Sequence, residues 1–552
     1  MTPAPQLYLI GDFNVDTFAR YLANTALEGA RVEVAQPSPV SAAFAAGPPG
    51  DGWTAFVWTR PEMISPAFQR ALNFEPFDNA DVIADVTRFG REVVGFARRC
   101  RAVLLPTWIV PPFVRGWGVL DWRPGLGVAS LLARMNLALA DALGNEPSIV
   151  MLDANRWMTT VGGRGWSQKA WYAAKSPFTP DLLQLAAADV VSAIDGFGGR
   201  ARRAIILDLD DVLWGGVVGE TGPLGVRIGG HDHVGEAFVD FQRALKALSR
   251  RGVLLAIVSK NDEAVALEAI DRHPEMQLRR EDFAAWRINW DDKAGNVAAV
   301  LAEMNLGAES AVFVDDQVIE RARVQSALPD ILVPDWPPDP SRFRETLESL
   351  HCFDAPSVTT EDRGRAGMMA AERSRRAAAA ASAGVEEWLQ SLAVRVAVEP
   401  LGDMNIERAA QLFNKTNQMN LSTRRMTSAD LAAWAASPDN LVLTFRVADR
   451  FGDSGLTGLV GLHIADTDAQ LVDFLLSCRV MGRRVEEAML HVAIAQARTK
   501  GAAALRARFV PTPRNAPCLE FFRRCGMREV GASEFMWSTG DVFGRPPSVT
   551  VA

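Results

Sequence analysis

Two carboxylates, Asp208 and Asp210, follow the apolar run 204–207 with one residue between them. A short apolar run with β-branched residues is typical of a buried parallel strand, which delivers polar side chains to the carboxyl edge of an α/β sheet. If the strand continued, alternation would put both carboxylates on the same side of the chain. Two carboxylates held together bind a divalent cation, or one of them stays protonated. An isolated pair is also compatible with an ordinary polar strand end, so the rest of the chain decides.

Three further polar groups follow in order. Ser259 ends an apolar run, Lys293 opens an amphipathic stretch, and the pair Asp315–Asp316 ends another apolar run. Repeated strands and helices of this kind predict that acid, hydroxyl, ammonium and acid meet at one sheet edge. The chemistry that uses this set is phosphoryl transfer through an aspartyl-phosphate.

The side chains would take different roles in that reaction. Asp208 would attack phosphorus, and Asp210 would protonate the leaving oxygen and then activate water. Ser259 and Lys293 would hold the phosphoryl oxygens. An Mg²⁺ ion would let a carboxylate approach an anionic phosphate, and its expected ligands are Asp208, Asp210, Asp315 and Asp316.

The intervals between these residues bear on the size of the substrate. About 50 residues separate Asp208 from Ser259, and 34 separate Ser259 from Lys293. The sheet's own strands and helices need this length, so we expect no cap domain and an open site. An open site suits a substrate carried on a protein, such as a phosphopantetheine arm. Trp214 and the glycines after it are expected to form a local flap.

Residues 204–335 resemble the haloacid-dehalogenase (HAD) superfamily of phosphotransferases, with Asp208, Ser259, Lys293 and Asp315 at its four motifs. Three longer sequence segments resemble the narrower FkbH-like family. They are Leu207-Asp208-Leu209-Asp210 with Leu213-Trp214-Gly215-Gly216, Val258-Ser259-Lys260-Asn261-Asp262, and Asn289-Trp290-Asp291-Asp292-Lys293. One departure is Asp211-Val212, where the family usually has Asn-Thr. Val212 cannot donate a hydrogen bond to phosphate.

The resemblance implies an enzyme that dephosphorylates a phosphorylated glycerate, with D-1,3-bisphosphoglycerate as donor. It would load the glyceryl group as a thioester on an acyl carrier protein, in polyketide or related secondary-metabolite biosynthesis. Mg²⁺ is the implied cofactor, and Trp214, Lys260 and Asn261 are the implied substrate-binding residues. Two other classes stay open: a Mg²⁺-dependent phosphatase of another phosphometabolite with scaffolding flanking domains, and a non-catalytic assembly protein.

Residues 1–200 form a separate unit that we expect to be a parallel α/β sandwich, with strands over 6–10, 101–106 and 148–152 and a helix over 128–143. Gly11-Asp12 resembles the first block of SGNH hydrolases, but Phe13 stands where the serine nucleophile is usual. No Asp-x-x-His block follows near residue 175. Ester hydrolysis is therefore unsupported, and a degenerate SGNH-like fold used for docking or packing is expected.

The HAD-like domain is assigned to 201–350, a charged helical connector to 351–395 and an α+β domain to 396–552. The last domain shows strands over 440–447, 457–464 and 469–477 and resembles GNAT acyltransferases. In that family the turn matching Arg479, Gly482 and Arg484 opens a helix whose amides cradle the pyrophosphate of coenzyme A. Arg484 replaces a small residue, and Phe522 stands where the general-acid tyrosine is usual.

The segment 414–425 is rich in hydrogen-bond donors, with Asn417, Gln418, Asn420 and Arg425 as its candidate acyl- or pantetheine-binding residues. The phrase also occurs in the FkbH-like family. Two interpretations of this segment are equally supported: a pocket for a polar acyl group or pantetheine amide, and a capped turn with exposed polar groups.

Composition limits the classes of protein to which this chain can belong. The chain has 552 residues and a net charge of −8, which argues against nonspecific nucleic-acid binding. The amino-terminal residues do not resemble a signal peptide, and no apolar run spans a membrane, so a soluble cytoplasmic protein is expected. No cysteine lies between Cys100 and Cys352, which makes direct attack by the carrier thiol simpler than a thioester on the HAD-like domain. Cys478 is the alternative.

Overall fold

A computed structural model describes residues 4–552 except 28, 36–38, 145, 231, 357–359, 466 and 532. The first three residues, on which the signal-peptide argument partly rests, lie outside the described residues. The chain divides into two compact units, Met1–Ala366 and Gly367–Ala552. Within the described residues, no helix is long and apolar enough to cross a membrane. The finer division into four segments stays a prediction.

The first sheet of unit 1 has five parallel strands, in the order β2 (Arg31–Val34), β1 (Gln6–Gly11), β3 (Thr54–Trp58), β4 (Ala102–Pro106) and β5 (Ile149–Leu152). Alternation along β1 sends Tyr8 and Ile10 into one apolar core and Leu7 and Leu9 into another. The expected strands β1, β4 and β5 are confirmed. β2 and β3 were not predicted.

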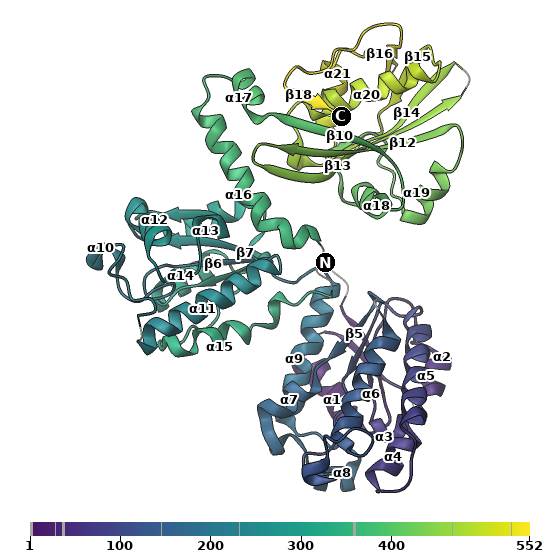
Figure 1. Ribbon diagram of the computed structural model, residues 1–552, viewed down its shortest axis with the longest axis vertical. Coiled ribbons are helices and arrows are strands. Elements are labelled where there is room, and N and C mark those ends of the chain that lie inside the picture. The colour runs from purple at the N-terminus through teal and green to yellow at the C-terminus, as the bar shows by residue number, and fades with distance from the viewer. Residues whose placement is uncertain are drawn as a thin grey trace. The chain divides into compact units, whose positions relative to one another are not determined.

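Helices cover both faces of this sheet (Figure 1). They are α1 (Asp16–Tyr21), α2 (Val40–Ala46), α3 (Pro61–Ile64), α4 (Pro66–Leu72), α5 (Asn79–Ala97), α6 (Val128–Leu143), α7 (Ala154–Val161), α8 (Gln168–Ala174) and α9 (Pro180–Phe197). Helices α5 and α6 pack in one core, and α1 and α9 in the other. The predicted helix over 128–143 is α6.

The second sheet of unit 1 has four parallel strands, in the order β8 (Phe283–Ile288), β7 (Leu254–Ser259), β6 (Ala204–Leu207) and β9 (Ala311–Val314). Its helices are α10 (Val218–Thr221), α11 (His233–Arg250), α12 (Glu263–Arg272), α13 (Lys293–Glu303), α14 (Val318–Ala327) and α15 (Phe343–Glu348). The described residues between Asp208 and Ser259 form α10, α11 and β7, and those between Ser259 and Lys293 form α12, one 3₁₀ turn and β8.

A turn, and not strand alternation, places the second carboxylate. β6 ends at Leu207, so the alternation assumed for Asp208 and Asp210 does not apply. Asp211 adopts a φ of 54°, a left-handed conformation that reverses the chain directly after the acids. Asp210 then lies beside Trp214 in an isolated bridge.

Unit 2 contains one mixed sheet in the order β16 (Arg528–Gly531), β17 (Glu534–Ser538), β15 (Ala504–Arg508), β14 (Asp468–Leu476), β13 (Gly452–Ala465), β12 (Asn440–Asp449), β10 (Val394–Pro400) and β18 (Val549–Val551), with β11 (Met419–Asn420) on β14. The predicted strands β12, β13 and β14 are antiparallel neighbours. The helices are α17 (Val385–Leu392), α18 (Ile406–Lys415), α19 (Ser428–Ala435), α20 (Val485–Thr499) and α21 (Ala516–Arg524).

The charged connector forms α16 (Thr360–Ala381), which spans the boundary between the units. Within unit 2 this helix is held by Arg375, whose Nε lies 2.7 Å from Oδ2 of Asp449 on β12. Both side chains are buried. A basic residue of the connector is therefore a structural ion-pair partner.

Candidate active site

A buried ammonium group between two buried carboxylates forms the centre of the site. Nζ of Lys293 lies 2.7 Å from Oδ2 of Asp208 and 2.6 Å from Oδ2 of Asp315. All three residues are at most 5% exposed. The two acids follow the adjacent strands β6 and β9, and Lys293 is the first residue of α13. The side chain of Asp292 accepts a hydrogen bond from the Gly295 amide and so fixes the start of that helix.

The electrostatics of this cluster are those of closely coupled charges. Burial lowers the pKa of Lys293, but the carboxylates of Asp208 and Asp315 outweigh it, so the net shift is upward. Burial, and next the charge of Asp208, raise the pKa of Asp315. Burial and the neighbouring carboxylates raise the pKa of Asp316 to about 6. The cluster thus has more acid than its one ammonium group can neutralise.

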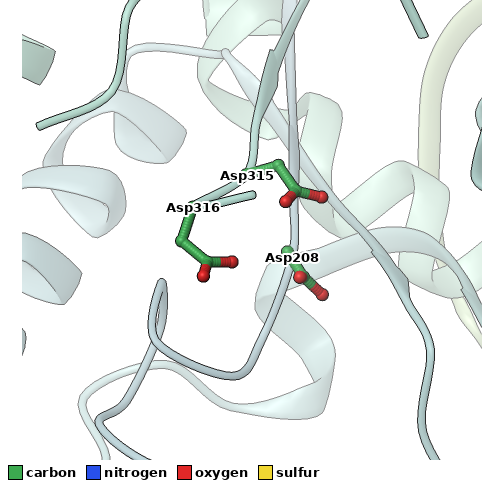
Figure 2. A group of neighbouring side chains, drawn as sticks. All are labelled: Asp208, Asp315 and Asp316. Carbon is green, nitrogen blue, oxygen red and sulfur yellow. The ribbon is translucent and has the colours of Figure 1, made fainter. Parts of the chain in front are cut away.

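The excess acid suits a divalent cation. Asp208, Asp315 and Asp316 each offer a carboxylate oxygen, and these oxygens lie within 4.8 Å of one another (Figure 2). Hard oxygen ligands of this kind fit Mg²⁺, which binds proteins through a few carboxylates and keeps several waters. Asp210, the fourth predicted ligand, is not in this group.

Asp210 belongs instead to a hydrogen-bond network with Ser259. Its Oδ1 accepts bonds from Nε1 of Trp214 at 2.8 Å and from the Val218 amide at 3.1 Å. Nδ2 of Asn261 donates to Oδ2 of Asp210 at 3.0 Å and to Oγ of Ser259 at 3.1 Å. The Asp210 carboxylate is therefore held in one orientation beside the hydroxyl expected to bind phosphate.

Two of the implied substrate-binding residues make polar contacts within the protein. Trp214 is fully buried, so the predicted flap does not include its side chain, and the indole acts by positioning Asp210. Nζ of Lys260 lies 2.7 Å from Oε1 of Glu320 in α14, an ion pair that ties the loop after β7 to that helix. Their contact with substrate stays a prediction.

Sequence reasoning missed two arginines: one holds the loop that carries the second acid pair, and the other contacts the residue before α13. Nη1 of Arg321 donates to the main-chain oxygens of Asp315 and Asp316, both at 2.9 Å. Nε of Arg323 lies 2.7 Å from Oδ1 of Asp292. Both arginines belong to α14, which begins just after the acid pair. Two arginines in the first turns of a helix that follows two acids are the sequence signal that could have identified them.

In unit 2, three of the four donor residues line one cavity. Asn417, Asn420 and Arg425 surround a space of about 240 Å³, together with Thr416, Thr423, Thr512, Pro513 and Arg514. Nη2 of Arg425 donates to Oδ1 of Asn417 at 2.6 Å. Nδ2 of Asn420, which is buried, donates to the Thr416 oxygen at 3.0 Å. Gln418 is exposed and does not line this cavity.

The predicted turn at the start of α20 is tied to carboxylates of its own chain. The Gly482 amide donates to Oε1 of Glu486 at 2.9 Å. Arg484 adopts a φ of 63° and pairs with Glu386 at 2.7 Å and Glu487 at 3.3 Å. Arg479, in the preceding 3₁₀ turn, is partly buried. The Gly482 amide and the Arg484 guanidinium, two of the groups expected to hold a pyrophosphate, are thus engaged with internal acids.

The corresponding edge of the first sheet has no nucleophile after Gly11-Asp12. The ring of Phe13 packs against Trp58 and Phe178 with centroids 5.5 and 5.6 Å apart. Nε of Arg60 lies 3.1 Å from Oδ1 of Asp12, and burial outweighs this contact and raises the pKa of Asp12 to about 6.

Comparisons with known protein families and with curated proteins give no match. Among solved structures, the N-terminal part of the protein BF1531 from Bacteroides fragilis, containing a phosphatase domain complexed with Mg, is 24% identical, with a TM-score of 0.58. The match covers 64% of this chain and 95% of that one. The ribosomal-protein-S18-alanine N-acetyltransferase from Escherichia coli (12% identity, TM-score 0.20) covers 26% of this chain and 90% of its own length. The spermidine N-acetyltransferase from Vibrio cholerae (14%, 0.23) covers 26% and 96%. Over 64% of its length, the chain therefore shares its fold with a protein that contains a phosphatase domain.

Proposed function

We propose that this protein is a Mg²⁺-dependent phosphotransferase of the HAD type that forms an aspartyl-phosphate on Asp208. The observation that carries the proposal is the Lys293 ammonium group between the Asp208 and Asp315 carboxylates, with Asp316 beside them. A buried acid cluster lowers the stability of the fold unless cations neutralise it, so its presence at a strand edge argues that the cluster has a function.

Each residue has a defined part in the reaction. Asp208 attacks phosphorus, and the displaced oxygen takes a proton from Asp210, which later deprotonates the attacking water. Trp214, Val218 and Asn261 hold Asp210 in place for both steps. Mg²⁺, held by Asp208, Asp315 and Asp316, would neutralise charge between the carboxylate and the anionic phosphate. Lys293 supplies further positive charge at the phosphoryl oxygens.

We further propose that the substrate is a phosphorylated glycerate, with D-1,3-bisphosphoglycerate as donor and an acyl carrier protein as acceptor. The carrier thiol attacks the acyl carbon, a C–S bond forms, and the C–O bond to phosphate breaks with the thiol proton leaving on phosphate. The phosphoryl group of the remaining ester then passes to Asp208, while its bond to the glyceryl oxygen breaks and that oxygen takes the proton of Asp210. Water, deprotonated by Asp210, finally releases the group from Asp208 as phosphate. Support comes from the described residues between Asp208 and Lys293, whose helices and strands are those of the sheet's own layers, and from the polar cavity of Asn417, Asn420 and Arg425 in unit 2.

A plain phosphatase acting on another phosphometabolite is the second candidate. The start of α20 favours it, because Gly482 and Arg484 are already paired with Glu486 and Glu386. A carrier arm or acyl donor would have to displace these contacts. In that case unit 2 would have no part in catalysis.

One experiment separates the two candidates. The full chain is incubated with D-1,3-bisphosphoglycerate, Mg²⁺ and purified holo carrier proteins, and both phosphate release and the intact mass of each carrier are measured. We expect a glyceryl adduct on a carrier, and phosphate release that chelation abolishes. Phosphate release without any adduct would favour the plain phosphatase. Release that survives chelation would contradict both.

A further inference from the structure

The carboxyl edge of the first sheet, which the proposed reaction does not use, carries an unusual set of exposed rings. The loop 107–127 follows β4 and presents Phe113, Trp117 and Trp122, and α8 presents Tyr172. Trp122 and Tyr172 are 72% and 70% exposed. Phe74, from the segment after α4, meets Trp117 edge-on with centroids 5.1 Å apart. These five residues are called the aromatic edge below.

Separate segments of the chain carry these rings. Helices α3, α4 and α8 lie at one end of this part of unit 1 (Figure 1). The Lys175 oxygen, at the end of α8, accepts a bond from the Asn14 amide after β1. In the part of the chain that the structure describes, six aromatic side chains are exposed, and five belong to the aromatic edge. Such a concentration of exposed apolar rings marks a binding surface.

The charges around the rings have one dominant sign. The segments 107–127 and 162–175 together contain five basic residues, Arg115, Arg123, Arg164, Lys169 and Lys175, all of them exposed, and a single acid, Asp121. The segment 73–78, which carries Phe74, adds two acids, Glu75 and Asp78. The carboxylate of Asp121 accepts bonds from the amides of Trp117, Val128 and Ala129 and so holds the loop in shape. The nearby acids Asp78 and Asp153 cap α5 and α7.

This surface is basic on a chain whose net charge is −8. The ammonium of Lys175 lies over the ring of Trp171 at 5.0 Å and adds positive charge next to Tyr172. The guanidinium of Arg60 lies over the same ring at 4.8 Å, and its charge is paired with Asp12 and Glu62. Aromatic anchors inside a basic rim match a partner with an apolar patch in an acidic surface.

We propose that the aromatic edge docks an acidic partner protein, namely the carrier whose thiol receives the acyl group. The identity of the carrier rests on the proposed function. The degenerate first domain would then supply a binding surface, at the edge where related folds place their sites. Rings anchor the partner, and the five basic side chains raise its association rate and orient it.

Two double variants of the full chain test the proposal: Trp117→Ala with Trp122→Ala, and Arg115→Glu with Arg123→Glu. The matched controls lie on α5 and α6 of the same part, Arg91→Glu with Arg98→Glu, and Leu137→Ala, all at exposed positions. The probes are a panel of purified holo acyl carrier proteins and a short fluorescein-labelled single-stranded RNA. Binding is measured directly, and phosphate release from p-nitrophenyl phosphate is measured in parallel.

We expect the edge variants to bind carriers about tenfold more weakly or worse, and the controls to bind as the parent does. Phosphate release from the small ester should be unchanged in every variant, which also reports intact folding. Carrier binding should weaken as salt rises. Equal affinity of parent and edge variants for carriers would overturn the proposal, as would binding of the RNA in preference to every carrier.

Failure of the proposed function gives a different pattern. If no carrier gains a glyceryl adduct but carriers still bind the parent more tightly than the edge variants, the docking surface stands and the acyl-transfer reaction is wrong. If adducts form at the parent rate in the edge variants, the reaction stands and the docking surface is wrong.

Discussion

Unit 1 contains two parallel sheets whose carboxyl edges have diverged in chemistry. At the edge of the second sheet, Asp208, Lys293 and Asp315 form a buried cluster of three charges. At the edge of the first sheet, Asp12 is paired with Arg60, and Phe13 packs among aromatic rings where a nucleophile could have stood. The same architecture thus places a reactive set in one case and an apolar surface in the other. Fold decides where a site can be, and side chains decide what it does.

The difference between the two edges also lies in their charge balance. Asp12 has the guanidinium of Arg60 beside it, so the protein itself supplies the positive partner of this carboxylate. The second edge has three acids around one ammonium group, so its excess negative charge can be neutralised by a bound cation, which in turn can bind a substrate phosphate. Acid that no cation of the protein neutralises, more than acid itself, is the property that distinguishes the proposed phosphoryl-transfer site from the other edge.

The largest effect is expected at the nucleophile. Asp208→Asn keeps the shape of the side chain but removes the charge that attacks phosphorus, so phosphate release should fall by roughly 10³-fold or more. Asp12→Asn, the equivalent change at the other edge, should leave the rate unchanged. Steady-state phosphate release measures both. Comparable losses in the two variants would mean that the edges are not functionally distinct.

Removing the ammonium group should be the largest change in stability. Lys293→Met leaves two buried carboxylates without their partner and should lower the free energy of unfolding by about 3–5 kcal/mol. Added Mg²⁺ should recover part of that loss, because an ion that binds only the folded state stabilises it. Denaturant unfolding with and without Mg²⁺ is the measurement.

Lys260→Met is the matched control for Lys293→Met. Its side chain is one-third exposed and forms an ion pair with one carboxylate, Glu320, so the cost should be well below that of Lys293→Met. Equal stability of the Lys293→Met protein and the parent would remove the charge-balance argument.

A smaller effect is expected in unit 2. Replacing Asn417 and Arg425 by alanine removes the pair that borders the polar cavity and should lower carrier loading about tenfold. Phosphate release should stay near the parent rate, because these contacts are made to the acyl group or the carrier arm. Intact mass of the carrier and phosphate release are compared. Unchanged loading would take this cavity out of the reaction.

The smallest effect concerns an ion pair between α9 and the 3₁₀ turn at His351–Phe353. Nδ1 of His351 lies 2.9 Å from Oδ1 of Asp189, which raises the pKa of His351 above 6.5. A raised histidine pKa stabilises the fold below the unfolded value, and the gain is lost as pH rises through the folded pKa. His351→Gln should therefore cost under about 1 kcal/mol at pH near 6, and less at pH near 8.5. Urea unfolding at both pH values would show an opposite trend if the pairing were wrong.

Sequence reasoning succeeded where hydrophobic runs carry the information. The runs before Asp208, Ser259 and Asp315 are fully buried strands of one sheet, and parallel pairing places their ends side by side. It failed where side chains choose between partners. Neither the pairing of Lys260 with Glu320 nor that of Arg484 with Glu386 follows from spacing, since both join segments far apart in the chain. Trp214 was expected at a flap because it precedes two glycines. Its side chain is buried because of packing against residues distant in the chain, which the local sequence does not reveal.

The central claim is that Asp208 becomes covalently phosphorylated. The full chain and a holo carrier protein are mixed with Mg²⁺ and with D-1,3-bisphosphoglycerate radiolabelled in its 3-phosphate ester, and the mixture is quenched in acid within the first turnover. The full chain is then digested for peptide mapping. We expect label on the peptide that contains Asp208, and none after chelation or in Asp208→Asn. Turnover with no label on that peptide, or label on a different residue, would contradict the aspartyl-phosphate mechanism.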